Sequence, residues 1–382
     1  MSRPDRESLT GYRVAVTSAN RAAELCLLLR RYGATVCAAP AISMVSLPDD
    51  DQLHRATETL IAQPPDVVIA TTAIGFRGWI AAADGWGLAG DLLAVLSGAR
   101  MVSRGPKATG ALRAAGLREA WSPDSESSRE VLDYLLKSGV AEQRIAVQLH
   151  GTTDDWDPVP TLLDELCAAG ADVVPIRVYR WRITPPGGDF DQLITRITRR
   201  QFDAVSFTSA PAVVATLTRA GELGIRGELL GALRYDVHAM CVGPVTAGPL
   251  TRLSIPTSWP QRMRLGALAR HIADTLPALR TRTVYAAGHR IEIRNTCVLV
   301  DDVVRPLSPA GMATLRVLAQ HPGTVVTRDD LVRMLPGNGS RHAVETAVLR
   351  LRTALGDKSI VATVVKRGYR LAIDEHSGAA RN

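Results

Sequence analysis

The sequence predicts an α/β protein with two units of parallel β-sheet, followed by a smaller α+β module. Short strands that are apolar throughout alternate with amphipathic helices from residue 13 to about 275. This pattern is typical of parallel sheets covered by helices on both faces. After residue 281 the pattern changes to short strands of alternating polarity and three closely spaced helices. A further module of different architecture is therefore expected at the C-terminal end.

Composition limits the class of protein. The 382 residues suffice for two or three domains, and no run approaches the roughly 18 apolar residues of a membrane span. Residues 1–10 lack the apolar core of a secretory signal. The five cysteines are scattered and never form a C-x-x-C pair, which favours free thiols in a reducing compartment. We therefore expect a cytoplasmic protein without a membrane partner.

Positive charge is concentrated at one end of the chain. The formal net charge is +7, and residues 281–382 contain 15 Lys and Arg against 9 Asp and Glu. The remaining residues are nearly balanced in charge. A basic C-terminal module predicts a polyanionic partner, with double-stranded nucleic acid as the first candidate.

The α/β part contains an internal duplication. Three pairs of segments recur in the same order: 13–42 with 144–179, 65–83 with 202–220, and 99–117 with 237–255. The third pair contains the phrases GPKATGAL and GPVTAGPL, each a Gly-Pro turn between a strand and a helix. The duplication predicts two similar α/β domains.

Small polar residues follow the predicted strands at their carboxyl ends. In parallel α/β sheets ligands bind beyond these ends, where helix N-termini present free N–H groups to anions. The expected ligand-cleft residues are Thr17, Ser18, Thr71, Thr72, Lys107, Thr109 and Thr208. Each Ser or Thr has an alternative role as a helix N-cap.

Motifs for other chemistries are absent from the sequence. It contains no G-x-G-x-x-G after a strand, no P-loop, no G-x-S-x-G elbow and no histidines at metal-ligand spacing. We therefore expect no nucleotide cofactor and no metal.

The α/β part resembles the uroporphyrinogen-III synthase family from residue 13 to about 275. The resemblance is carried by the duplicated units, FTS at 207–209, VY at 178–179 and G-P-x-T-A at 243–247. It implies two Rossmann-like parallel-sheet domains joined by an extended two-strand linker, near 38–42 and 174–180. It also implies a cofactor-free cyclisation of hydroxymethylbilane, a linear tetrapyrrole polycarboxylate, with inversion of one ring. The expected domains are 1–40 with 178–275, 41–177, a linker 276–287, the module 288–375 and a tail 376–382.

The resemblance carries catalytic residues over only in part. The family's tyrosine falls on Tyr179, a candidate acid or hydrogen-bond donor to the leaving group, and its second-half serine and threonine fall on Ser209 and Thr246. In the first half the threonine position holds Ala108, and Thr109 follows. One residue of displacement turns a helical side chain by about 100°. The substitution favours ligand binding over catalysis.

The C-terminal module resembles the winged helix-turn-helix domain of OmpR/PhoB-type response regulators, over residues 288–373. A helix follows Ser308-Pro309, a second begins after Thr327, and a third spans 341–356 and ends at Gly356. Residues 359–373 predict a β-hairpin whose tip lies near Lys366, Arg367 and Gly368. Gly311 stands where that family usually has an acidic residue.

The third helix predicts a DNA-reading surface. Val344, Val348, Leu351 and Leu355 form a buried stripe, because they recur at helical spacing. The opposite face carries His342, Thr346, Leu349, Arg350 and Thr353, of which Arg350 is the expected base contact. The expected phosphate contacts are Arg341, Arg352, Lys366, Arg367 and Arg370. The alternative is a solvated basic helix face.

Two functions fit this sequence. The favoured one is a transcriptional regulator whose synthase-like body is a sensor of an anionic, tetrapyrrole-like ligand or an oligomerisation module, acting as a homodimer or with a partner regulator. The alternative is an active uroporphyrinogen-III synthase that carries a DNA-binding module. A phosphorylated receiver domain is excluded, because no acidic pair follows the first strand and Asp66 precedes its strand.

Overall fold

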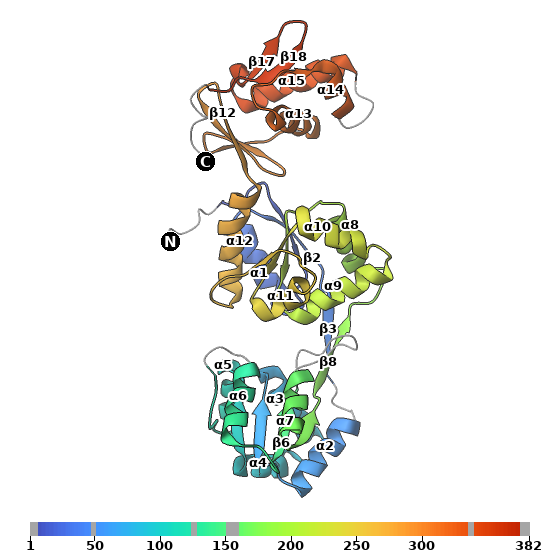
Figure 1. Ribbon diagram of the computed structural model, residues 1–382, viewed down its shortest axis with the longest axis vertical. Helices are drawn as coiled ribbons and strands as arrows, with labels where there is room; N and C mark the ends of the chain where they lie inside the picture. The colour runs from blue at the N-terminus through green and yellow to red at the C-terminus, as the bar shows by residue number, and fades with distance from the viewer. Residues whose placement is uncertain (1–6, 47–50, 124–127, 150–159, 335–339, 375–382) are drawn as a thin grey trace. The chain divides into compact units, whose positions relative to one another are not determined.

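The computed structural model describes residues 7–46, 51–123, 128–149, 160–334 and 340–374. The described residues divide into two compact units. The second unit comprises Pro40–Pro186 with Ala210–Arg219, and the first unit comprises the rest. Each unit contains a parallel sheet with helices, and the first also contains the C-terminal module, which confirms the predicted fold class (Figure 1). The expected tail 376–382 lies outside the described residues.

The first unit contains a five-stranded parallel sheet in the order β11-β10-β9-β1-β2. Its strands are β1 (Arg13–Val16), β2 (Thr35–Ala38), β9 (Ala204–Phe207), β10 (His238–Cys241) and β11 (Thr257–Ser258). Strand β1 pairs with β9, with Val14 opposite Ala204, so two distant chain segments build one sheet. The helices along these segments are α1 (Ala22–Arg31), α8 (Asp189–Thr198), α10 (Arg226–Tyr235), α11 (Pro244–Thr251) and α12 (Leu265–Arg280). Helix α9 (Ala210–Glu222) follows β9, and its residues Ala210–Arg219 group with the second unit.

The second unit contains a four-stranded parallel sheet in the order β5-β4-β6-β7. Its strands are β4 (Val67–Ala70), β5 (Arg100–Ser103), β6 (Arg144–Gln148) and β7 (Asp172–Ile176), and its helices are α2 (Asp51–Ala62), α3 (Ala73–Gly85), α4 (Ala89–Gly98), α5 (Pro106–Ala114), α6 (Ser128–Ser138) and α7 (Pro160–Ala168). Trp79 is fully buried, and its indole N–H donates to Thr57 Oγ1 at 3.0 Å. The buried indole therefore has the partner that its polar atom requires.

An antiparallel ribbon of β3 (Ile42–Ser46) and β8 (Tyr179–Ile183) completes the second unit. The two-strand element that the sequence predicts is present, but it begins later than expected in both segments. The reason is that residues 172–176 pair with β6 as strand β7 of the four-stranded sheet. Strand pairing with the sheet thus takes up part of the segment expected to be a free linker.

The C-terminal part, residues 282–374, forms a winged helix domain. A four-stranded antiparallel sheet of β12 (Arg282–Ala286), β13 (His289–Ile293), β14 (Val298–Val300) and β15 (Val303–Arg305) precedes the helices α13 (Pro309–Gln320), α14 (Arg328–Met334) and α15 (Arg341–Leu355). Strand β16 (Val326–Thr327) lies between α13 and α14, and a 3₁₀ turn (Lys358–Ile360) leads from α15 into β17 (Val361–Val364) and β18 (Gly368–Leu371). These three strands form the wing sheet in the order β16-β18-β17.

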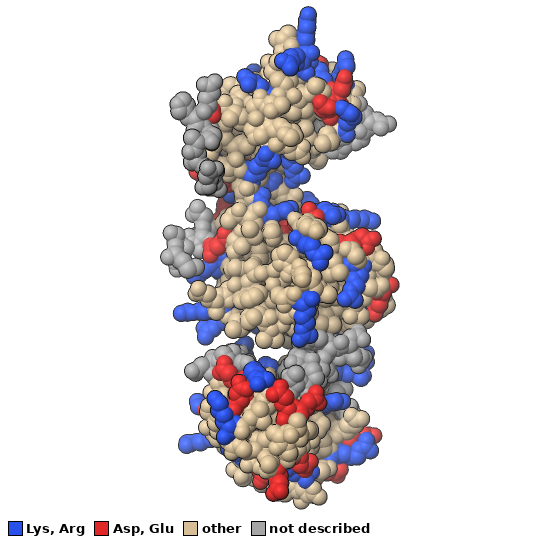
Figure 2. Space-filling view, in the orientation of Figure 1, with Lys and Arg blue, Asp and Glu red and all other residues tan. Residues whose placement is uncertain are grey.

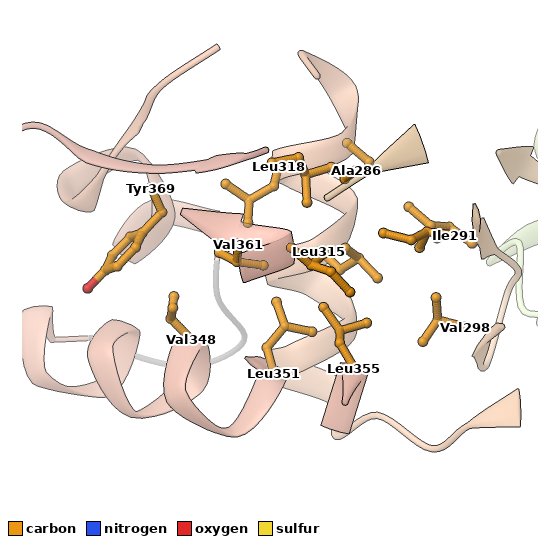
Figure 3. Packing of buried hydrophobic residues seen from close by; sticks show 14 of the residues in the cluster. Ala286, Ile291, Val298, Leu315, Leu318, Val348, Leu351, Leu355, Val361 and Tyr369 are labelled. Carbon is orange, nitrogen blue, oxygen red and sulfur yellow. The ribbon is translucent and has the colours of Figure 1, made fainter. Parts of the chain in front are cut away.

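Residues 276–287, expected to be a linker, contain the end of α12 and all of β12. Val284 and Ala286 of β12 are buried in the core of the winged helix domain, which explains why this strand belongs to the domain. Figure 3 shows the centre of that core, where Leu315 and Leu318 of α13 face Leu351 and Leu355 of α15. The stripe predicted for the third helix is thus confirmed as buried.

Local sequence signals fix the ends of these helices. Ser308 Oγ accepts a hydrogen bond from the Gly311 N–H at 3.1 Å, and Thr327 Oγ1 accepts one from the Asp330 N–H at 3.1 Å. Gly356 ends α15 with φ of 90°, a conformation that favours glycine. The predicted caps at these three positions are confirmed.

A histidine bridge attaches the end of α15 to the four-stranded sheet. His289 Nδ1 lies 2.6 Å from Asp301 Oδ2, and its Nε2 lies 3.2 Å from Asp357 Oδ2, just beyond α15. Hydrogen bonds to Asp301 and then to Asp357 raise the pKa of His289 above its ordinary value of 6.5. The doubly protonated imidazole is therefore the form that can donate to both carboxylates.

This bridge predicts a pH-dependent stability of the winged helix domain. A histidine whose pKa is higher in the folded than in the unfolded state stabilises the fold fully below the unfolded value, and the effect is lost as pH rises through the folded value. We expect His289→Asn to lower the melting temperature at pH 6, with a difference from the parent that vanishes by pH 9. Calorimetry of the full chain at both pH values measures this. His342→Asn, at the exposed start of α15, is the control, and an equal loss at both pH values for His289→Asn would contradict the bridge.

Candidate functional site

Helix α15 presents a polar face opposite its buried stripe. His342, Leu349, Arg350 and Thr353 are exposed on this face, and Thr346 is partly buried. Leu349 is 60% exposed on this face, next to Arg350, so its side chain is accessible to a ligand. An arginine with a neighbouring apolar group is the combination that reads guanine edges and thymine methyl groups in the DNA major groove.

The face is extended by cations on the wing. Lys366 and Arg367 are exposed in the turn between β17 and β18, and Arg370 is exposed on β18. Figure 2 shows basic side chains projecting from the hairpin end of the winged helix domain. Among the described residues, the side chains of Arg350 and of these three cations have no hydrogen-bonded or ion-paired partner. Their charges are available to an anionic ligand.

Two of the arginines expected to contact phosphate already have partners within the domain. Arg352 donates from Nε and Nη2 to the Val361 carbonyl at 2.9 and 2.6 Å, and from Nη2 to Thr363 Oγ1 at 2.8 Å. Arg341 forms a two-pronged pair with Asp329 of α14, with both distances 2.9 Å. Arg352 thus attaches α15 to the wing, and Arg341 attaches it to α14.

In the first unit, polar residues lie at the carboxyl ends of β1, β9 and β10. Thr17 is fully buried and donates to the Ser206 carbonyl at 3.0 Å, and Thr208 donates to Ser18 Oγ at 2.9 Å. Thr246 is the third residue of α11 and is 5% exposed. Ser209, which is partly buried, follows Thr208 directly. The structure brings these expected residues to one sheet edge, with Thr17 committed to an internal bond.

In the second unit, Thr71, Thr72 and Tyr179 belong to one hydrogen-bonded group. Thr71 donates to the Gln148 carbonyl at 2.6 Å, and the Thr72 N–H donates to Gln148 Oε1 at 3.1 Å. Thr72 Oγ1 caps α3 by accepting from the Gly75 N–H at 3.1 Å and lies 3.4 Å from the Tyr179 hydroxyl. The N-cap alternative therefore holds for Thr72.

The duplicated Gly-Pro turns have the same helical register. Pro106 is the first residue of α5 and Pro244 the first of α11, each after a glycine N-cap. Ala108 therefore occupies the place of Thr246, and it is buried. Thr109 Oγ1 lies 2.6 Å from Ser103 Oγ, while Lys107 is exposed. Thr109 does not supply the hydroxyl that Ala108 lacks.

The sequence interpretation missed Gln148, Ser103 and Ser206. Gln148 is fully buried and holds both Thr71 and Thr72, yet its position could have been found from the duplication. The segments RVAVT and RIAVQ place Gln148 where the other copy has Thr17. Within the described residues, no group of three or more His, Cys, Asp or Glu side chains has the geometry of a metal site.

Comparison with known families matches two parts of the chain. A model for uroporphyrinogen-III synthase HemD matches residues 23–270, and a model for the C-terminal domain of transcriptional regulatory proteins matches residues 304–371. In the comparison with curated proteins nothing matches.

Solved structures resemble the same two parts. A mutant uroporphyrinogen III synthase from the extremely thermophilic bacterium Thermus thermophilus is 28% identical, covering 69% of this chain and 98% of its own, with a TM-score of 0.57. The DNA-binding domain of Klebsiella pneumoniae RstA, solved with the RstA box, is 28% identical and covers 24% and 97%, with a TM-score of 0.21. That of Escherichia coli CadC is 25% identical and covers 25% and 95%, with a TM-score of 0.22. Within the described residues, no helix is both long and apolar enough to cross a membrane.

The two family matches lead to one conclusion. The chain belongs to the uroporphyrinogen-III synthase HemD family over residues 23–270, and it carries a DNA-binding domain of the OmpR/PhoB type over residues 304–371.

Proposed function

We propose that this chain is a cytoplasmic, DNA-binding transcriptional regulator whose synthase-like body is a ligand-sensing or oligomerisation module. The observation that carries the proposal is the exposed face of α15, with Arg350, whose side chain has no partner among the described residues, beside exposed Leu349. The wing adds Lys366, Arg367 and Arg370 as candidate phosphate contacts. A recognition helix supported by a basic wing is suited to double-stranded DNA, where base contacts specify and phosphate contacts position.

The contacts of Arg341 and Arg352 support this assignment indirectly. Arg341 pairs with Asp329 of α14 near the start of α15, and Arg352 bonds the wing near its end, so both ends of the helix have contacts before any ligand binds. A fixed surface loses less conformational entropy on binding than a mobile one. We infer that Arg350 reads bases, while Arg341 and Arg352 fix the helix that carries it.

The difference between the two Gly-Pro turns supports ligand binding by the synthase-like body. The hydroxyl supplied by Thr246 in the second copy is missing in the first, where buried Ala108 stands. The helix N-termini at these turns still offer N–H groups to an anion such as a tetrapyrrole carboxylate. Such a ligand regulates only through different affinities for two states of the protein. Winged helix domains commonly act in pairs on half-sites, so a homodimer or a partner regulator is part of the proposal.

The DNA proposal predicts different effects of two neighbouring arginines. Arg350→Ala should leave the melting temperature unchanged and relax preference at one base position by about 1–3 kcal/mol, because it removes a base contact. Arg352→Ala should lower stability by about 1–3 kcal/mol, because it removes bonds to the wing. Selection from a random duplex library, followed by titration of selected and scrambled duplexes, measures the first effect, and thermal unfolding of the full chain measures the second.

Arg370→Ala is the control for phosphate contacts. It should weaken binding to all sequences equally and reduce the salt slope by about one. Affinity for the parent chain should fall by orders of magnitude between about 50 and 200 mM salt. An affinity that is independent of salt would overturn the DNA proposal.

A second function, synthase activity, is favoured by the presence of Tyr179, Ser209 and Thr246 at the positions that match the family. We expect the parent protein, given hydroxymethylbilane, to form the inverted cyclic isomer no faster than the background, because the first-half threonine is replaced by Ala108. Isomer analysis of the product measures this. Inverted product that disappears in Tyr179→Phe would establish the second function and contradict a body that only senses.

A further inference from the structure

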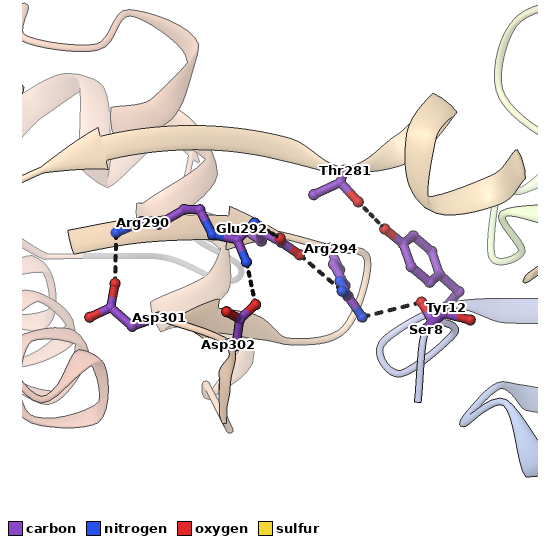
Figure 4. Close-up of polar contacts among 8 residues, drawn as sticks. All are labelled: Ser8, Tyr12, Thr281, Arg290, Glu292, Arg294, Asp301 and Asp302. Atoms are coloured by element: carbon purple, nitrogen blue, oxygen red, sulfur yellow. Dashed lines mark hydrogen bonds and ion pairs between the residues drawn. The ribbon is translucent and has the colours of Figure 1, made fainter. Parts of the chain in front are cut away.

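The turn between β13 and β14, Arg294–Cys297, contacts the five-stranded α/β part of the first unit. The Thr296 N–H and the Thr296 hydroxyl both donate hydrogen bonds to the Gly11 carbonyl, at 2.9 and 3.1 Å. Arg294 Nη1 donates to the Thr10 carbonyl at 3.0 Å. It also donates to the Ser8 carbonyl at 3.3 Å, a bond that Figure 4 shows. The winged helix domain is thus hydrogen-bonded to the segment that leads into β1.

Gly11 permits this close approach. Its φ is +87°, and a Cβ at this position would lie 2.4 Å from Cys297 Sγ. Cys297 is buried, and burial raises the pKa of its thiol, so it packs here as a small apolar group. The backbone at Gly11 and the turn therefore fit without space for a side chain.

A buried carboxylate lies at the centre of the contact. Asp203, just before β9, is 2% exposed, and its Oδ2 accepts from the Arg13 N–H at 2.8 Å and from Asn295 Nδ2 at 2.9 Å. Arg280 Nε lies 3.9 Å from Asp203 Oδ1. A buried carboxylate is costly unless its oxygens are satisfied, so Asn295 supplies a donor that the α/β part needs.

Asn295 also leads into the DNA-binding helices. Arg316 of α13 donates from Nη2 to the Asn295 carbonyl at 2.5 Å and to Asn295 Oδ1 at 3.2 Å. A continuous chain of bonds therefore runs from β1 and β9 through Asp203, Asn295 and Arg316 to α13. A second tie lies nearby, where the Tyr12 and Thr281 hydroxyls are 2.5 Å apart.

We propose that the Arg294–Cys297 turn is a fixed joint that makes the five-stranded sheet and the winged helix domain one rigid body. This inference rests on the proposed function. The joint transmits any movement of strands β1 and β9 to the DNA-binding helices. The two strands carry Thr17 and Ser206 near their carboxyl ends and Arg13 and Asp203 at their amino ends. The two ends are about 13 Å apart, since a strand rises about 3.3 Å per residue. Any ligand response that moves the DNA-binding helices must therefore also move this sheet.

A charge exchange tests the joint in the full chain. Asn295→Asp sets two carboxylates together and removes the donor, so it breaks the match. Asp203→Asn removes the charge but keeps an oxygen that can accept from the Arg13 N–H and from Asn295 Nδ2. The double variant Asp203→Asn/Asn295→Asp restores one amide and one carboxylate. We expect hydrogen exchange at the Thr296 amide to accelerate roughly tenfold or more in Asn295→Asp, to accelerate less in Asp203→Asn, and to return to near the parent rate in the double variant. Asn20→Asp, exposed and away from the joint, adds the same charge and should change nothing.

A distance measurement distinguishes a fixed joint from ordinary packing. Spin labels at Tyr235→Cys on α10 and Val365→Cys on the wing, both exposed positions, report on the two parts; Cys37 and Cys167 are replaced by Ser. We expect one narrow distance in the parent and in the double variant, and a broad distribution in Asn295→Asp. A broad distribution in the parent, or a narrow one in Asn295→Asp, would overturn the joint. Because no DNA is present, this failure is distinct from a failure to bind DNA, which would overturn the proposed function.

Discussion

The Asp203 carboxylate receives hydrogen bonds from two parts of the chain that are far apart in sequence. The Arg13 N–H comes from β1, next to β9 in the sheet, and the amide of Asn295 comes from the turn of the winged helix domain. At 2% exposure the carboxylate cannot be solvated by water instead. Burial raises its pKa, while the donors around it act in the opposite direction. The stability of this buried charge therefore depends on the α/β part and the DNA-binding part being in contact, which gives the fusion a structural reason to behave as one unit.

The duplication gives the body its architecture and its asymmetry. Both copies place a helix start after a Gly-Pro turn, so both sheets keep an edge suited to anions. The copies differ where chemistry would be expected: Thr246 is retained, and Ala108 replaces its counterpart. Several of the remaining hydroxyls bond to the protein itself, as Thr17 and Thr71 do. The two copies therefore share the strand–turn–helix architecture and differ in the side chains at its polar edge.

The DNA-binding domain separates two roles that arginine can take. Arg352 has its hydrogen-bond donors directed at the Val361 carbonyl and Thr363, because it lies on the flank of α15 that faces the wing. Arg350 lies on the outward face and, within the described part of the chain, has no partner. Two arginines that are two residues apart thus have different roles. Arg352 attaches the helix to the wing, and the side chain of Arg350 is available to a ligand.

The fold class, the helix caps and the buried stripe of α15 could be predicted from the residues alone, because each depends on a local residue pattern. Apolar periodicity states which face of an element is buried, and Ser308, Thr327 and Gly356 act on their own helix ends. The partners of the charged side chains, in contrast, became known only from the folded chain. The Asp203–Asn295 bond spans 92 residues, and the Arg341–Asp329 pair joins two helices. The spacing of charged residues in the sequence does not indicate which residues they pair with, because the pairing depends on how distant elements pack. For the same reason the sequence placed a linker at 276–287, where packing of Val284 and Ala286 makes a strand.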